Sequence, residues 1–523
     1  MRRLPVRKLA WFGAAAALAG LLALNLLYAG TFVRTWDEAD FVFALDRFDL
    51  LAMQPHFPGY PFFIGGGMIA RLWISDPLLA LTAFNALMTA GSAVPIFLLA
   101  RREVGAGAAA WAAVWVGATP YLWLMGSRPM SECAGIAALW WFLWSVREAA
   151  DRPRSLWRYV AAAALFGALM GIRLSYFPFG VALVLLLALC RRSFGGGRGW
   201  GLLLRLLIAG AFQLVGVLGL MLSEGSVQGF WQLAEAFVAG HFSEWGGGIG
   251  AVDVPLAERV ATVFGDHLVR DVLLGRSAVV GAIASALLVL VAWGSLLARG
   301  RTDSAASGSV EPRYIAWLII CLAAYAVWAV LGQNVEKARH VAPLAGPLLL
   351  ACYIAAIRTF RSLRLPSHAP RVSRAIRLGI GAVMAAYLCA QAFHGVRLLR
   401  EQAERPPAVY QLHDYLGELR EPFTVYTWEE TRVLQYLQAD YDHRRIVTYG
   451  YFLAVVASAA EEEGAGRRIL LTDHVLDGFL AQNPEAARLA VPLARFESNA
   501  LFDPVYSRIT LYEWRGAAEQ GGP

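Results

Sequence analysis

The chain has 523 residues, of which 58% are hydrophobic and only 16% are charged, and its formal net charge is +7. Soluble domains contain roughly 45–50% apolar and about 25% charged residues, so this composition excludes an ordinary soluble protein and a disordered chain. The five cysteines are far apart and beside or within apolar runs, which indicates neither a disulfide framework nor a zinc site. Because the apolar residues gather in runs of about 18–22, long enough to cross a bilayer core, the chain is predicted to be a polytopic α-helical membrane protein.

Eleven apolar runs are predicted to be membrane-spanning helices. The first, residues 9–29, follows four basic residues. It is longer than the apolar core of a cleaved signal peptide, which is about 7–15 residues, so we interpret it as an uncleaved first helix. The other ten are expected near residues 79–100, 107–125, 130–146, 157–173, 176–190, 202–222, 273–297, 314–331, 341–357 and 376–394.

Basic residues alternate between the connecting loops. Arginines cluster in every second loop, whereas the loops between these hold only scattered cations. Cytoplasmic loops carry the excess of positive charge, so the amino terminus is predicted to be cytoplasmic and the carboxyl-terminal segment extracytoplasmic. The net positive charge therefore follows membrane topology and does not indicate nucleic acid. High arginine, alanine and leucine usage favours a bacterial plasma membrane.

The composition changes sharply after the last predicted span, which divides the chain into a transmembrane domain (1–394) and a soluble domain (395–523). In the second part, strand-like runs alternate with helical runs, which predicts a small extracytoplasmic α/β domain. The expected strands are 423–428, 445–449, 468–472 and 506–514, and the expected helices are 429–438, 452–463 and 473–481. No phosphate-binding glycine loop follows any of these strands, so nucleotide binding is not indicated.

The first predicted outer loop, 30–78, places ionisable groups at the membrane surface. Asp37 and Glu38 come directly after the first span, and four apolar side chains that follow them (Phe41, Val42, Leu45 and Phe48) would share one helical face. This pattern predicts a helix in the membrane interface. The proline-rich element HFPGYPFF would form an extended turn before a second surface helix over residues 60–73. The alternative is that Asp37 only caps the helix and that the prolines only shape the turn.

This arrangement of a carboxylate pair, an interfacial helix, a proline-rich turn and a second interfacial helix resembles the GT-C glycosyltransferases. Within them it is most similar to the protein O-mannosyltransferase and aminoarabinose-transferase branch (glycosyltransferase family 39-like). The resemblance in motifs covers the first four spans. Over the rest of the chain, only the topology is similar. It implies a transferase that moves a monosaccharide from a polyprenyl-phosphate lipid to an acceptor protein, lipid or glycan at the outer face. Direct displacement with inversion is expected, because no second carboxylate is placed as an obvious nucleophile.

The resemblance also implies catalytic carboxylates. Asp37 matches the family's catalytic residue and is expected to be the general base, while Glu38 would position the acceptor or tune Asp37. A second acidic residue is expected in the next outer loop, where Glu132 begins the fourth span. Helix capping is the alternative for Glu132. Arg128 would hold the phosphate or simply pair with Glu132.

The departing phosphate needs positive charge near the bilayer surface. Lys337, Arg339 and His340 resemble the family's basic cluster before a proline-containing helix, with interfacial snorkelling as the alternative. Arg173, in a tight outer turn, is a further candidate for a substrate contact. Two more substrate-binding candidates, His56 and Tyr60, lie in the proline-rich element. Aminoarabinose-type enzymes have a lysine before these prolines, so the histidine weakens a prediction of that particular sugar.

The loop 239–248 contains His241 and Glu244 next to a run of glycines. It is a candidate for a mobile loop that gates the acceptor, and the HxxE pair is a weak candidate for a divalent-cation site. Since a lone exposed histidine is more often structural, no metal is assigned.

Two other functions compete with the transferase. A transporter or flippase of lipid-linked sugars would carry ionisable groups at mid-membrane depth. The predicted span interiors are nearly free of them, which favours chemistry at the surface. A non-catalytic assembly protein with the same fold is the third hypothesis, and the presence of Asp37, Glu38 and Glu132 argues against it.

Overall fold

The computed structural model describes residues 6–194, 199–243, 247–249, 253–298, 312–364, 370–463 and 467–516. Contacts between residues divide the chain into two compact units. The first, here called the helical unit, comprises Met1–Ala29 and Ala44–Arg400. The second, the tail unit, comprises Gly30–Phe43 and Glu401–Pro523. The segment that carries Asp37 and Glu38 therefore packs with the carboxyl-terminal part of the chain.

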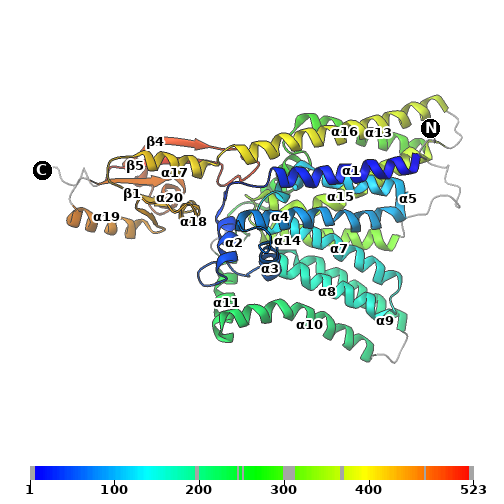
Figure 1. Cartoon of the computed structure of the whole chain (residues 1–523), viewed down its shortest axis with the longest axis horizontal. Helices are drawn as coiled ribbons and strands as arrows, with labels where there is room; N and C mark the ends of the chain where they lie inside the picture. Colours follow the sequence, from blue (N-terminus) through cyan, green and yellow to red (C-terminus); the bar gives the residue numbers. More distant parts are fainter. Residues whose placement is uncertain are drawn as a thin grey trace. The chain divides into compact units, whose positions relative to one another are not determined.

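Long helices make up most of the helical unit and run beside one another (Figure 1). They are α1 (Val6–Leu27), α4 (Pro77–Gly91), α5 (Ala93–Gly117), α7 (Ser131–Asp151), α8 (Leu156–Ile172), α9 (Val181–Phe194), α10 (Gly199–Glu224), α13 (Ala278–Ala298), α14 (Pro312–Gly332), α15 (Ala342–Ser362) and α16 (Pro370–Glu404), the last of which continues into the tail unit.

Every segment expected to span the membrane is largely helical. Within the described residues, eight stretches are long and apolar enough to cross a bilayer, and one of them, Pro77–Gly117, has 41 residues. The prediction of a polytopic helical membrane protein is confirmed, while the count of eleven spans stays a prediction. One further apolar helix, α8, has only 17 residues.

Shorter elements connect the long helices. They are α2 (Trp36–Asp46), α3 (Pro61–Ala70), α6 (Pro120–Gly126), η1 (Leu174–Gly180), α11 (Val227–Ser243), α12 (Leu256–Ala261), the π-helix η2 (Thr262–Leu273) and η3 (Ala338–Val341). The two helices expected in the first outer loop, α2 and α3, are both present. The first differs from the expected amphipathic pattern, because Glu38 and Asp40 are as buried as Phe41. Phe48 lies beyond the end of α2.

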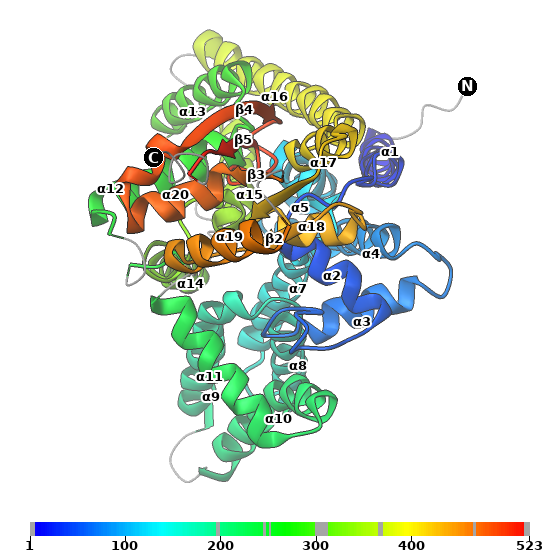
Figure 2. The same ribbon diagram turned by 90° about the vertical axis from the view of Figure 1, so that its left-hand side faces the viewer.

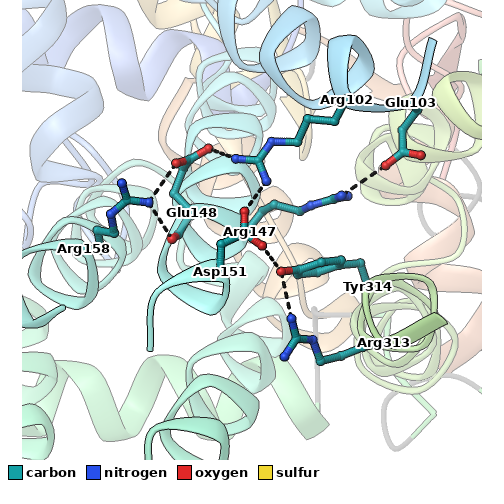
Figure 3. A network of polar contacts seen from close by, with 8 residues as sticks. All are labelled: Arg102, Glu103, Arg147, Glu148, Asp151, Arg158, Arg313 and Tyr314. Atoms are coloured by element: carbon teal, nitrogen blue, oxygen red, sulfur yellow. Dashed lines mark hydrogen bonds and ion pairs between the residues drawn. The ribbon is translucent and has the colours of Figure 1, made fainter. Parts of the chain in front are cut away.

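A polar network joins α5, α7, α8 and α15 (Figure 3). Glu103 of α5 pairs with Arg147 of α7 at 3.1 Å and with Arg358 of α15 at 2.6 Å. Glu148 of α7 pairs with Arg158 of α8 at 3.0 Å and also with Arg102. Arg102, Arg147 and Arg358 lie between predicted spans, in segments that the charge pattern assigned to one side of the membrane. Their proximity in the structure agrees with the predicted alternation of loops. Which side of the membrane they face stays a prediction.

The tail unit contains a five-stranded sheet with strand order β2-β1-β3-β5-β4. The strands are β1 (Phe423–Thr427), β2 (His443–Arg445), β3 (Arg468–Thr472), β4 (Ala490–Glu497) and β5 (Arg508–Trp514). β1 is parallel to β2 and β3, whereas β5 is antiparallel to β3 and β4. The predicted α/β fold is confirmed.

Helices cover both faces of this sheet (Figures 1 and 2). One face packs against α17 (Ala408–Glu418) and α18 (Thr431–Tyr436), and the other against α19 (Tyr449–Glu463) and α20 (Asp473–Gln482). β4 was not expected from the sequence. It contains Pro492 and shifts register between Pro492 and Ala494, which an edge strand tolerates because one side of it is unpaired.

Candidate active site

A hydrogen-bonded cap begins the helix that carries the first carboxylates. The hydroxyl oxygen of Thr35 accepts a hydrogen bond from the backbone N–H of Glu38 at 3.3 Å. The Glu38 carboxylate in turn accepts one from the backbone N–H of Arg34 at 2.6 Å. This reciprocal pattern resembles a capping box, which satisfies N–H groups that a helix start leaves free. Glu38 is fully buried, and its carboxylate caps the start of α2.

The third acidic residue of this segment is held in an ion pair. Asp40 is fully buried, and its Oδ1 lies 2.6 Å from Nε of Arg432 in α18. The side chain of Arg432 is only 12% exposed. Asp40 and Arg432 are separated by 392 residues in the chain and meet inside the tail unit.

Asp37 differs from both neighbours because it is partly exposed. It lies in the first turn of α2, where free N–H groups and the helix dipole stabilise a negative charge. Tyr506 lies nearby: its hydroxyl accepts a hydrogen bond from the N–H of Trp36 at 3.5 Å and donates one to Glu429. Burial, followed by the charges of Glu429 and Asp37, raises the pKa of Tyr506 well above its usual value, so this phenol stays protonated.

A second cluster forms around Glu132 in the helical unit. Glu132 lies in the first turn of α7 and is fully buried. Its Oε1 is 3.0 Å from Nη2 of Arg173 and 3.0 Å from Nε of Arg339. Arg173 also donates from Nη1 to the hydroxyl oxygen of Ser131 at 2.9 Å. Three residues that the sequence singled out in different loops therefore meet at one carboxylate oxygen.

Asn85 of α4 holds the start of α7 in place. Its amide nitrogen donates to the carbonyl oxygens of Met125, Arg128 and Met130 at 3.3, 2.9 and 2.7 Å. Its side-chain oxygen accepts from the N–H of Ala134 at 2.8 Å. One buried side chain thus fixes the turn before Glu132. Glu132 pairs with Arg173 and Arg339, and the side chain of Arg128, four residues before Glu132, is also buried.

The proline-rich element reaches the same cluster. The Cζ atom of Arg173 lies 5.9 Å from the centre of the Tyr60 ring. The Tyr60 hydroxyl lies 3.2 Å from Nε2 of His56. Tyr60 itself has a left-handed backbone conformation (φ 46°) directly before α3. Both candidates from this element are therefore connected to Arg173.

The basic loop before α15 contributes Arg339 to the cluster. Arg339 is 7% exposed, so it does not follow the alternative of snorkelling toward lipid headgroups. The Tyr325 hydroxyl donates to the carbonyl oxygen of His340 at 2.7 Å, and His340 donates from Nδ1 to the carbonyl oxygen of Asn334 at 3.1 Å. Lys337 is half-buried in the same loop.

The sequence did not single out the residues that fix this basic loop. Arg259 of α12 is fully buried and donates to the carbonyl oxygens of Val330, Gly247 and Gln333 at 2.9, 3.0 and 3.1 Å. Burial lowers the pKa of Arg259. The only signal in the sequence was that Arg259 is a cation in a predicted outer loop.

His267 of η2 adds a second contact to the basic loop. Its Nε2 donates to the carbonyl oxygen of Val335, and its Nδ1 lies 3.4 Å from Oδ2 of Asp271. Asp271 in turn accepts two hydrogen bonds from Arg276, at 2.7 and 3.1 Å. Arg259 and His267 thus both contact the segment just before Lys337.

His241 makes a structural contact in the described part of its loop. Its Nε2 donates to the carbonyl oxygen of Gly332 at 2.9 Å, and its ring stacks near Trp328. Glu244, the other member of the HxxE pair, lies outside the described residues.

Comparison with known proteins tests the fold. No protein-family model matches the chain, and no curated protein matches it in sequence. Among solved structures, ArnT from Cupriavidus metallidurans bound to undecaprenyl phosphate matches with a TM-score of 0.54 and 14% identity, over 97% of this chain and 99% of that chain. The apo state of the same protein matches with a TM-score of 0.51 and 14% identity, over 97% and 98% of the two chains.

The chain has a GT-C fold. The predicted resemblance to GT-C glycosyltransferases, and to the aminoarabinose-transferase branch among them, is confirmed as a likeness in fold. An oligosaccharyltransferase from Archaeoglobus fulgidus also aligns, with a TM-score of 0.45 and 14% identity over 88% of this chain and 69% of that chain.

One group of possible metal ligands occurs in the described part of the chain: Glu430, Asp473 and His474, with ligand atoms within 4.8 Å of one another. The geometry favours an ion pair. His474 donates from Nδ1 to Glu430, and its Nε2 faces the carbonyl oxygen of Val505 at 3.2 Å. Both ring nitrogens then carry hydrogens, so neither offers a lone pair to a metal.

This ion pair makes the stability of the tail unit depend on pH. Burial alone would lower the pKa of His474, but the charge and hydrogen bond of Glu430 outweigh it and raise the pKa to about 9. A raised pKa stabilises the fold fully below the unfolded value of about 6.5, and this contribution is lost as pH rises through about 9. We expect a loss of roughly 3 kcal/mol between pH 6.5 and 9.5.

Hydrogen exchange of β3 and β5 in the full-length protein, corrected for the intrinsic rates, measures this opening free energy. His474→Gln should remove most of the pH dependence. His413→Gln is the control, because His413 is a tail histidine whose Nδ1 contacts the hydroxyl of Tyr441 at 2.9 Å. An equally steep pH dependence in wild type and His474→Gln would contradict the expectation.

Proposed function

We propose that this multi-pass membrane protein is a glycosyltransferase that transfers a monosaccharide from a polyprenyl-phosphate lipid to an acceptor protein, lipid or glycan outside the cytoplasm. The observation that carries the proposal is the convergence of Arg173 and Arg339 on buried Glu132. It occurs in a chain whose fold is similar to that of ArnT, a protein solved with undecaprenyl phosphate bound.

The cluster has the chemistry that a departing phosphate requires. Negative charge grows on the phosphate oxygen as the sugar leaves, and guanidinium groups held in place beforehand stabilise that charge. In our proposal Glu132 orients Arg173 and Arg339, and Lys337 adds a third cation. Tyr60 and His56 would border the same site, since Tyr60 contacts Arg173. Arg128 would also contact the donor phosphate.

Asp37 is the proposed general base. It would take the proton of the acceptor hydroxyl while that oxygen bonds to the anomeric carbon and the carbon–oxygen bond to the phosphate breaks. The products are the glycosylated acceptor, with inverted configuration, and the free polyprenyl phosphate. Glu38 would act through its cap at the start of α2, which fixes the backbone of Asp37.

The proposed orientation has the amino terminus in the cytoplasm and the tail outside the plasma membrane of a bacterium. It is supported by the alternation of basic loops and by the arginine network that joins α5, α7, α8 and α15. The boundary at 394/395 between a membrane domain and a soluble domain is part of the same proposal. The described structure adds that residues 30–43 pack with the tail.

Reconstitution tests the proposed function. The protein in liposomes would be given a panel of polyprenyl-phosphate sugars with crude envelope acceptors, and release of polyprenyl phosphate would be measured. Release that depends on both donor and acceptor is the expected result. Movement of a labelled lipid between leaflets without release would overturn the transferase and establish the flippase instead.

A further inference from the structure

The segment that carries Asp37 is held by side chains of the carboxyl-terminal domain. Downstream of Asp37, Arg432 binds Asp40 at 2.6 Å. Upstream, the guanidinium carbon of Arg445 lies 4.9 Å from the centre of the Trp36 ring and 4.0 Å from that of Trp428. All of these residues belong to the tail unit.

The start of the same segment is fixed to the end of α16. The Arg34 guanidinium donates to the carbonyl oxygens of Gln402 and Arg405, the latter at 3.4 Å. The Thr31 hydroxyl donates to the carbonyl oxygen of Ala403 at 2.8 Å. A helix leaves its last carbonyl oxygens without partners inside the helix, and a cation there also complements the helix dipole. Residues 31–34 therefore cap α16, and these hydrogen bonds hold them at the carboxyl end of that helix.

We infer that the carboxyl-terminal domain positions Asp37 for catalysis and that Arg432 is the main positioning residue. This inference rests on the proposed function. Asp40 follows Asp37 by three residues, about one helical turn, so the direction in which Asp40 points sets the direction in which Asp37 points. The pair between Asp40 and Arg432 therefore fixes the rotation of α2 about its own axis.

Burial makes the Arg432 contact specific. Asp40 is fully buried and the Arg432 side chain is 12% exposed, so removing one partner leaves a charge in an environment that disfavours it. Removing both charges together leaves two neutral groups that can still form a hydrogen bond. A double-mutant cycle can therefore separate the role of the pair from the role of either side chain.

The tail contains a matched control. Arg468 of β3 binds Glu513 of β5 at 2.7 Å. This pair also joins an arginine to a carboxylate within the tail unit, and its two residues lie on neighbouring strands of the sheet. Arg468→Gln and Arg432→Gln make the same chemical change, but only Arg432→Gln removes a contact to residues 30–43.

The experiment uses full-length protein in detergent and in liposomes. Hydrogen exchange of peptides covering residues 30–43 measures the contact itself, independently of activity. The kcat and the KM for the polyprenyl-phosphate sugar, measured with a donor that wild type uses, report its role in transfer. The variants are Arg432→Gln, Arg432→Lys, Asp40→Asn, the double variant Asp40→Asn/Arg432→Gln, and the Arg468→Gln control.

The expected result is faster exchange over residues 30–43 in both single neutral variants, with kcat lower by roughly 10- to 100-fold and KM for the donor nearly unchanged. Arg432→Lys and the double variant should recover most of the kcat, and Arg468→Gln should behave as wild type. A kcat loss without faster exchange, or faster exchange with normal kcat, would overturn the positioning role. A double variant whose loss of kcat equals the combined losses of the two single variants would also overturn the positioning role. If wild type turns over no donor, the proposed function fails, and the positioning role fails with it even when the exchange data show the contact.

Discussion

Asparagine in place of Asp37 should lower kcat for sugar transfer by roughly 100- to 10,000-fold, the usual contribution of a general base. The substitution keeps the size and shape of the side chain but removes its ability to take a proton from the acceptor hydroxyl. Asp37 is partly exposed, whereas Glu38 and Asp40 are fully buried, so it is the carboxylate of the three that an acceptor can reach most directly.

Release of polyprenyl phosphate under saturating donor and acceptor measures this effect. Asp46→Asn is the control, because Asp46 lies in the same helix and its exposed carboxylate pairs with Arg71. The control should keep nearly full activity. If Asp37→Asn retains half of the wild-type kcat or more, another group is the base.

Replacing Arg339 by glutamine should lower kcat/KM for the lipid donor by roughly 100- to 1,000-fold, the typical cost of removing one preorganised donor that stabilises developing charge. Glu132 would keep its ion pair with Arg173, so the carboxylate is not left buried without a partner. Arg339→Lys should recover only part of the activity, because lysine keeps the charge but not the planar geometry of the guanidinium group.

Steady-state kinetics with varied donor and with varied acceptor separate this effect from a general loss of activity. Arg270→Gln is the control, because Arg270 is 57% exposed in η2 and pairs with Asp266. A defect confined to the KM for the acceptor would contradict the assignment of Arg339 to the donor phosphate.

Much of the fold could be predicted because its signals are local. The length of each apolar run alone predicts a membrane-spanning helix. The segments expected to span the membrane are accordingly largely helical in the structure. The alternation of strand-like and helical runs in the tail reflects periodicity within a few residues. The exceptions are two strands: β4 was missed because Pro492 interrupts its pattern, and the strand expected at 445–449 is instead His443–Arg445, with α19 beginning at Tyr449.

The candidate site was predicted less completely because its contacts join distant parts of the chain. Glu132, Arg173 and Arg339 were each singled out as separate candidates, but their meeting at one carboxylate oxygen was not predicted. Asp40 was not singled out in the sequence, since nothing near it indicates a partner 392 residues away. Arg259 was grouped with scattered outer cations, because its contacts to backbone carbonyl oxygens have no sequence pattern.

Because Asp40 and Arg432 are far apart in the chain, Asp40 is synthesised well before its ion-pair partner. At about 5–20 residues per second, a ribosome needs roughly 20–80 seconds to extend the chain from one residue to the other. Throughout that time α2 lacks its final partner, and a nascent chain released early would never acquire it. The ion pair that holds α2 therefore forms only after translation of most of the chain, so products terminated before Arg432 would lack it.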